Sequence, residues 1–307
     1  MSILTTIRTA AGGLLFLLSF QLMAGSENLP VKSVNMPVAN VISQALTGMT
    51  PLFEGKRNPF MMQQVCALAR GDVTQEQVNQ VLKDNNVVVE SLSDNRSALA
   101  LLVNKDLLAQ QMSCTAYLAT SLFEPVSMEN YLPKTPRGAE QKMAKAGAAL
   151  PTIRAVTFDA VRFDADMEVR LAVAKATAQM YAVIAANLAG TPPLTWAQYQ
   201  QRVAEIVADY AGEYLKSVAA FYTADSKSPL KSEAIQGNDF RVRNALGDML
   251  EQHDGQSLLY SQGVKWLGEG RIFGKMDVVP VTLISGNPAE KLSHKNKANV
   301  SKNRRRE

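Results

Sequence analysis

Residues 166–189 read DMEVRLAVAKATAQMYAVIAANLA, and this stretch decides the fold class. Between Asp166 and Asn187 this stretch has few strongly polar side chains, namely Glu168, Arg170, Lys175 and Gln179. A helix that is apolar over most of its circumference is buried among other elements, and small alanines let neighbouring helices approach closely. The stretch therefore predicts the central helix of a bundle, ended by Gly190 and the prolines that follow it.

The segment after these prolines predicts a second long helix. Thr195 and Gln198 have the spacing of a capping box, which marks a helix start. Apolar and aromatic side chains then recur at helical spacing: Trp196, Tyr199, Val203, Ile206, Val207, Tyr210, Tyr214, Val218 and Phe221. Aromatic residues at this spacing beside valine and isoleucine are expected in the core, although they could also form a carbohydrate- or peptide-binding surface.

Helix signals also mark the first half of the chain. Asn58 and Pro59 suit an N-cap and a first helical position, and Gly71 suits the residue after the end, so a helix is expected between them. A second capping box starts at Thr74. Residues 94–124 again show helical periodicity, with an expected break at residues 104–106.

The chain has two cysteines, Cys66 and Cys114. An even pair is expected to form a disulfide in an oxidising compartment. The loop of about 48 residues that it would close corresponds to roughly 4 kcal/mol in the chain-entropy model. Two buried reduced thiols are the alternative, and the pair is too small for a zinc site.

The signal changes to β near the C-terminus. Three short apolar runs separated by glycines predict a hairpin and a third strand: residues 264–267, 271–273 and 278–284. Pro280 predicts that the last strand lies at a sheet edge. Asn238 is expected to begin a shorter helix that ends near Gly255. The predicted fold is therefore mainly α, a helical bundle with a small C-terminal β-hairpin or three-strand element.

The predicted organisation has five parts. They are a signal peptide at residues 1–26, an N-terminal helical region at 27–124, a Pro-containing linker at 125–138, a helical domain with the β element at 139–285, and a basic, disordered tail at 286–307.

The first 26 residues have the pattern of a bacterial export signal. Arg8 precedes an apolar run at residues 10–20, and small residues near Ala24 offer a cleavage site. Eleven apolar residues fall short of the roughly 20 that span a bilayer, which favours cleavage over a membrane anchor. No other stretch is expected to span a membrane, so the mature protein is predicted to be periplasmic or secreted.

The net charge of +4 is concentrated at the C-terminus. Residues 286–307 hold seven lysine and arginine residues against two glutamates, and they end in Arg304, Arg305 and Arg306. Such a tail could contact nucleic acid, an anionic lipid surface or an acidic protein, or it could serve only as a solubilising terminus. Nucleic acid is not an expected partner of an exported protein, whereas protein partners are expected.

Three acidic residues are the main catalytic candidates. Glu205, Asp209 and Glu213 are spaced four apart on the polar side of the second long helix, so their side chains line up. Like charges at this spacing destabilise a helix by a few tenths of a kcal/mol each, roughly. The row could bind a cation or a basic partner, or supply the paired acids of a glycosidase. A solvated acidic face relieved by Arg202 and Lys216 is the favoured interpretation.

The chain has two histidines, and His253 is the second weak catalytic candidate. It could act as a general base or a metal ligand, but the last turn of a helix also stabilises a histidine. Because no second histidine is expected beside it, neither a metal site nor a cofactor is predicted.

These observations favour a non-enzymatic exported protein that works through its surfaces. An accessory role in an envelope, secretion or conjugation assembly fits the export signal and the absence of a recognisable catalytic motif. The rival hypothesis is an exported carboxylate-dependent hydrolase of a cell-wall or glycan substrate. A secreted toxin or colonisation factor is a further alternative.

Overall fold

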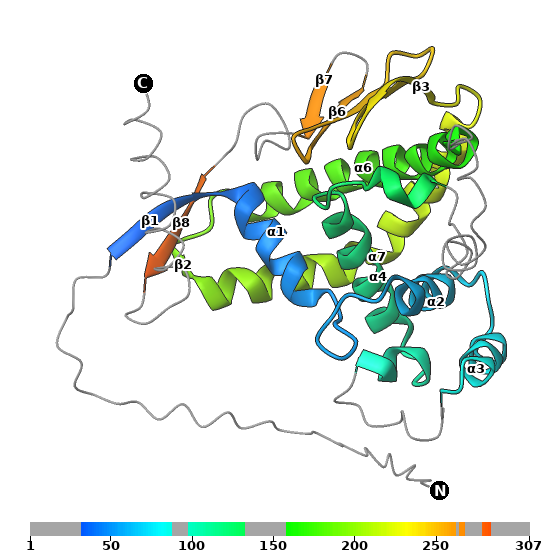
Figure 1. Ribbon diagram of the computed structural model, residues 1–307. Coiled ribbons are helices and arrows are strands. Elements are labelled where there is room, and N and C mark those ends of the chain that lie inside the picture. The colour runs from blue at the N-terminus through cyan, green and yellow to red at the C-terminus, as the bar shows by residue number, and fades with distance from the viewer. Residues whose placement is uncertain (1–31, 88–97, 133–157, 262–263, 268–277, 284–307) are drawn as a thin grey trace, which may run out of the picture.

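The computed structural model describes residues 32–87, 98–132, 158–261, 264–267 and 278–283 (Figure 1). The predicted signal peptide, the basic tail and the expected strand at residues 271–273 lie outside these ranges.

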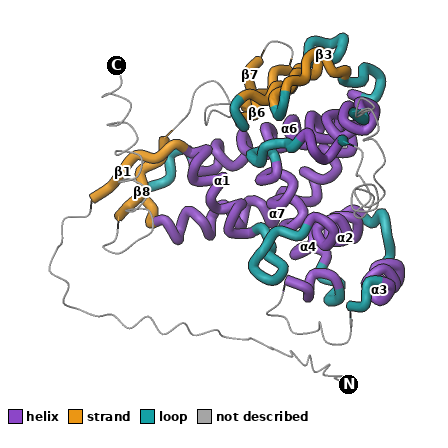
Figure 2. The backbone as a smooth tube through the Cα atoms, in the orientation of Figure 1, coloured by secondary structure: helices purple, strands orange, loops and turns teal. Residues whose placement is uncertain are grey.

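Helices dominate the described residues, which confirms the prediction of a mainly α fold (Figure 2). The α-helices are α1 (Val38–Met49), α2 (Pro59–Arg70), α3 (Gln75–Asp84), α4 (Leu107–Ser121), α6 (Ala160–Leu188) and α7 (Trp196–Asp225), with short 3-10 helices η2 (Ala98–Leu102) and η3 (Met128–Tyr131).

The two longest helices, α6 and α7, pack against each other, and α1 and α4 pack on both of them. Helix α2 lies on α4, and α3 lies on α2 (Figure 1). The interior side of α6 and α7 carries large, fully buried side chains, among them Phe163, Tyr181, Tyr199 and Tyr214. Burying each such side chain stabilises the fold by about 1.5–3 kcal/mol, so this interface holds the bundle together.

The helix starts confirm the capping predictions. The Asn58 side chain accepts a hydrogen bond from the Met61 amide at the start of α2. Complete capping boxes at Thr74 and Thr195 begin α3 and α7. Helix α6 begins earlier than expected, at Ala160, because Asp159 caps its first turn by accepting from the Arg162 amide.

The strands form two sheets. The first has the order β1-β8-β2, with β1 (Lys32–Pro37), β8 (Val278–Leu283) and β2 (Leu194–Thr195). The second is an antiparallel sheet of consecutive strands that lies along α6 (Figure 1). Its strands are β3 (Lys231–Gln236), β4 (Asp239–Arg243), β5 (Met249–His253), β6 (Gln256–Ser261) and β7 (Val264–Leu267).

The helix expected from Asn238 to Gly255 is wrong, because this stretch forms β4, β5 and the turns around them. Phe240 and Val242 alternate with exposed residues, which is the period of a strand. Asp254 and Gly255 both have positive φ, at 50° and 74°, as a two-residue hairpin turn requires. The C-terminal sheet is therefore larger than the predicted three-strand element.

The last strand also differs from its prediction. Strand β8 pairs with β1 and β2 rather than with the neighbouring hairpin, and it is the central strand of its sheet. Pro280 is tolerated there because β2 is only two residues long and pairs with Val281 and Thr282. The ladder on that side therefore does not extend to the proline, which lacks an amide donor.

The predicted linker begins inside the packed structure. Gln252 of β5 binds the Val126 backbone twice, accepting from its amide at 2.7 Å and donating to its carbonyl at 2.9 Å. Met128 and Tyr131 that follow are buried in the same hydrophobic cluster as α1 and α7. Residues 133–138 lie outside the described ranges, and the predicted domain boundaries themselves stay a prediction.

Helix α6 is long and apolar enough to cross a membrane, contrary to the expectation that no stretch after the signal is. However, 67% of the most apolar 18-residue segment of α6 is buried inside the fold. The core helix of a bundle meets the same criteria of length and composition. The packing against α7 accounts for this composition.

Candidate functional site

The acidic row, Glu205, Asp209 and Glu213, lies on the exposed side of α7. Glu205 forms an ion pair with Arg202 at 3.2 Å and accepts a hydrogen bond from Gln201 at 3.1 Å. Exposed carboxylates remain hydrated, and among the described residues these three line no enclosed pocket that could hold a substrate between an acid and a base. The geometry favours the solvated acidic face over a catalytic pair.

Neutralising the acidic row tests this interpretation. The triple variant Glu205→Gln, Asp209→Asn, Glu213→Gln is expected to change the free energy of unfolding by less than about 0.5 kcal/mol, because exposed substitutions have small effects. Urea denaturation of the variant beside the unaltered protein measures the difference. A loss of more than about 2 kcal/mol would show that the row holds a structural partner.

His253 lies at the end of β5 rather than at a helix end, so the expected stabilisation by a helix dipole is wrong. Its Nδ1 is 2.8 Å from Oδ2 of Asp239, and its Nε2 is 3.6 Å from Oδ2 of Asp254. The ligand atoms of these three residues lie within 4.8 Å of one another, which is close enough for one metal ion. The His253 and Asp254 side chains are 70% and 89% exposed, and the hairpin turn itself accounts for their proximity, since the Asp254 amide also donates to Asp239.

A buried triad of charged residues joins three elements that are far apart in sequence. Lys175 of α6 places its Nζ 2.9 Å from Oδ1 of Asp225 and 3.0 Å from Oδ2 of Asp248. Asp225 is the last residue of α7, and Asp248 precedes β5. Exposed fractions of the side chains are only 10%, 7% and 2%. The buried triad thus fixes the sheet to the two central helices.

The triad has one positive and two negative members. Burial alone would lower the pKa of Lys175, but hydrogen bonds and charges from Asp225 and Asp248 outweigh it and raise that pKa. Oδ2 of Asp225 is buried and has no hydrogen-bond partner among the described residues. A buried charge that is incompletely paired is costly, so this oxygen of Asp225 opposes the stabilisation that the triad provides.

The turn between β4 and β5 holds Asp248 in place. Asn244 donates from Nδ2 to Oδ2 of Asp248 at 3.0 Å, and its Oδ1 accepts from the amides of Leu246 and Asp248. Gly247 has a φ of 90°, which closes this turn. The β4–β5 turn therefore orients the Asp248 carboxylate independently of its contact with Lys175.

Two acidic residues one helical turn apart on α6 contact β3 and the residue just before it. Asp164 accepts from the Ser232 hydroxyl at 2.6 Å. Glu168 accepts from the Leu230 backbone, yet its pKa is raised because burial and the charge of Asp164 oppose its ionisation. Together with Lys175, these residues form a polar seam between α6 and the sheet.

The triad has no local signature in the sequence. Its one sequence signal is Lys175, a charged residue within an otherwise apolar helix. Its partners are 50 and 73 residues away, so no local spacing could have named them.

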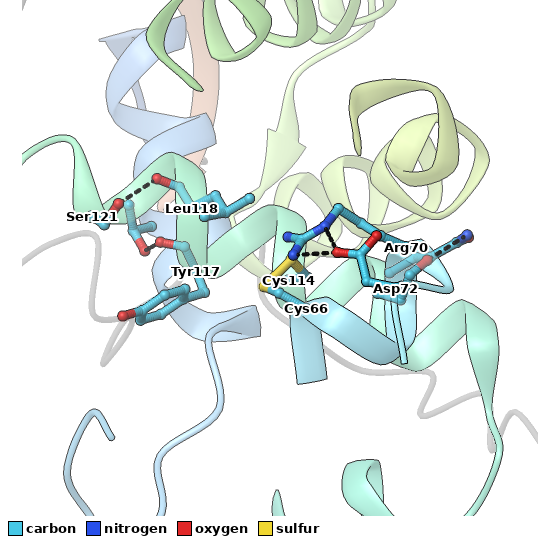
Figure 3. The surroundings of a disulfide bond; sticks show 10 residues. Cys66, Arg70, Asp72, Cys114, Tyr117, Leu118 and Ser121 are labelled. Atoms are coloured by element: carbon cyan, nitrogen blue, oxygen red, sulfur yellow. Dashed lines mark hydrogen bonds and ion pairs between the residues drawn. A yellow bond between two sulfur atoms is a disulfide. The ribbon is translucent and has the colours of Figure 1, made fainter. Parts of the chain in front are cut away.

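Cys66 of α2 and Cys114 of α4 are disulfide-bonded, with an S–S distance of 2.03 Å (Figure 3). Both residues are buried. In the same view, Arg70 and Asp72 form an ion pair just past the end of α2. The predicted bridge is therefore present, and it ties α2 to the bundle through α4.

The terminal arginines, Arg304 to Arg306, lie outside the described residues, so their role stays a prediction. Comparison of the chain with protein-family models, curated proteins and solved structures gives no match.

Proposed function

We propose that the chain is an exported, non-enzymatic helical protein that acts by binding a macromolecular partner, as an accessory of a cell-envelope, secretion or conjugation assembly. The disulfide between Cys66 and Cys114 carries the proposal. Such bonds form and persist in the periplasm or outside the cell and are rare in a reducing cytosol. The exposure of the acidic row supports a binding role over an acid–base mechanism.

Cell fractionation tests the export part of the proposal. The chain, expressed with its own N-terminus in a bacterium, is expected in the periplasm or medium, with a mature start near Gly25 or Glu27. Its two cysteines are expected to resist thiol labelling until a reductant is added. The matched control carries Leu15→Arg and Leu17→Arg, which interrupt the apolar run and should hold the chain in the cytoplasm with Met1 intact. Cytoplasmic, uncleaved chain without these substitutions would contradict export.

Cross-linking tests the binding part separately. Exported protein treated with a cross-linker in intact envelopes is expected to join one defined partner in a fixed ratio. The triple acidic-row variant serves as a folded comparison, because its stability is expected to be unchanged. Chain that is exported but remains uncross-linked, or that releases fragments from cell-wall material, would contradict the binding role.

A further inference from the structure

We propose that Lys175 and Asp225 are a covalent cross-linking site, in which the lysine amine and the aspartate carboxyl condense to an intramolecular isopeptide bond with Asp248 as the proton acceptor. The bond would join the middle of α6 to the end of α7 and release one water. This inference does not depend on the proposed export or binding role, because the reaction needs only the folded chain.

Burial separates this lysine from the ordinary ion pairs of the protein. Surface pairs such as Arg202–Glu205 and Arg241–Glu251 have side chains that are 25–49% exposed. The triad side chains are at most 10% exposed. Exclusion of water matters because hydrated ammonium and carboxylate groups do not condense, and in a dry site water does not compete for their hydrogen bonds.

Proximity is the second requirement. Nζ of Lys175 lies 2.9 Å from Oδ1 of Asp225, and both groups project from packed helices. Reacting groups held this close act at a very high effective concentration. The terminal torsion of an aspartate is soft, so a rotation about Cβ–Cγ is enough to turn the carboxyl carbon toward the amine.

The hydrogen bonds assign different roles to the two carboxyls. Oδ2 of Asp225 has no partner among the described residues, so it can leave as water without breaking a hydrogen bond. Asp248, in contrast, is held by Asn244 and faces Lys175 with the same oxygen at 3.0 Å. Asp225 is therefore the electrophile, and Asp248 is the base that receives the lysine proton.

The reaction balances from the triad as it stands, with one ammonium and two carboxylates. A proton passes from Nζ to Asp248, and the free amine attacks Cγ of Asp225. The departing Asp225 oxygen takes the second amine proton and the proton that Asp248 returns, and it leaves as water. The products are a neutral amide and the Asp248 carboxylate, so no oxidant or other reactant is needed, and one buried charge replaces three.

Intact-mass spectrometry of the reduced, purified full chain tests the proposal directly. The mass is expected to be one water lower than the sequence of the observed mature chain requires. Trypsin should then yield one branched peptide that joins residues 171–202 to residues 217–227, because an acylated Lys175 is no longer cleaved. A mass equal to that of the linear chain would overturn the proposal.

Variants assign the roles. Lys175→Arg keeps the charge but lacks the nucleophilic amine, and Asp248→Asn lacks the base, so both should have the linear mass. Lys216→Arg, on the exposed side of α7, is the matched control and should retain the water loss. Water loss that maps to another peptide, for example to the Asp254-Gly255 turn, would overturn the assignment equally.

Discussion

Lys175→Ala is expected to lower the free energy of unfolding by about 3–5 kcal/mol, the typical effect of removing one partner from a buried ion pair. The substitution leaves Asp225 and Asp248 buried side by side without a counter-charge. Urea denaturation followed by circular dichroism measures the change. A lower midpoint urea concentration with an unchanged dependence of the free energy on urea shows the loss of stability. The loss is expected with or without the isopeptide bond, because either form of the site depends on the lysine.

Two comparisons make this prediction specific. Arg202→Ala removes an exposed ion pair on α7 and should change the free energy of unfolding by no more than about 1 kcal/mol. The double variant Lys175→Ala, Asp225→Ala should lose less unfolding free energy than its two single variants lose together. The second substitution removes a buried carboxylate that has lost its counter-charge. Equal, small effects of Lys175→Ala and Arg202→Ala would contradict the role given to the triad.

Loss of the disulfide is expected to have a similarly large effect. The variant Cys66→Ala, Cys114→Ala should lose about 4 kcal/mol of unfolding free energy, the chain-entropy value for a loop of 48 residues. Because the bond joins α2 to α4, the change should also expose α2 and α3 to proteases before the rest of the bundle.

The reductant provides the control for this second prediction. Adding reductant to the unaltered protein should reproduce most of the destabilisation, whereas the double variant should unfold identically with and without it. If the unaltered protein unfolded at the same urea concentration in both conditions, the disulfide would not contribute as expected.

Local signals were sufficient for several parts of the fold. The caps at Asn58, Thr74 and Thr195 were readable because a cap and its acceptor lie within one turn of the chain. The composition of α6 predicted its central position for the same reason, since burial of an alanine-rich helix depends on its own residues. Pairing of Cys66 with Cys114 followed because no other cysteine was available.

The prediction failed where local and tertiary preferences diverged. Asn238 resembles a helix cap, but the Asp254-Gly255 pair was a hairpin signal that the helical interpretation overlooked. Nothing near Pro280 could show that β8 pairs with β1, more than 240 residues earlier in the chain. Strand pairing is non-local, so register and sheet order are properties of the whole fold.

The sequence by itself determined the helical class, the starts of three helices and the disulfide, because caps, periodicity and a single cysteine pair are encoded in neighbouring or unique residues. Tertiary structure alone decided the strand pairing and the meeting of Lys175, Asp225 and Asp248. Their proximity arises from packing of α6, α7 and the β4–β5 turn, and this packing is driven by burial of apolar surface contributed by many segments rather than by any single one.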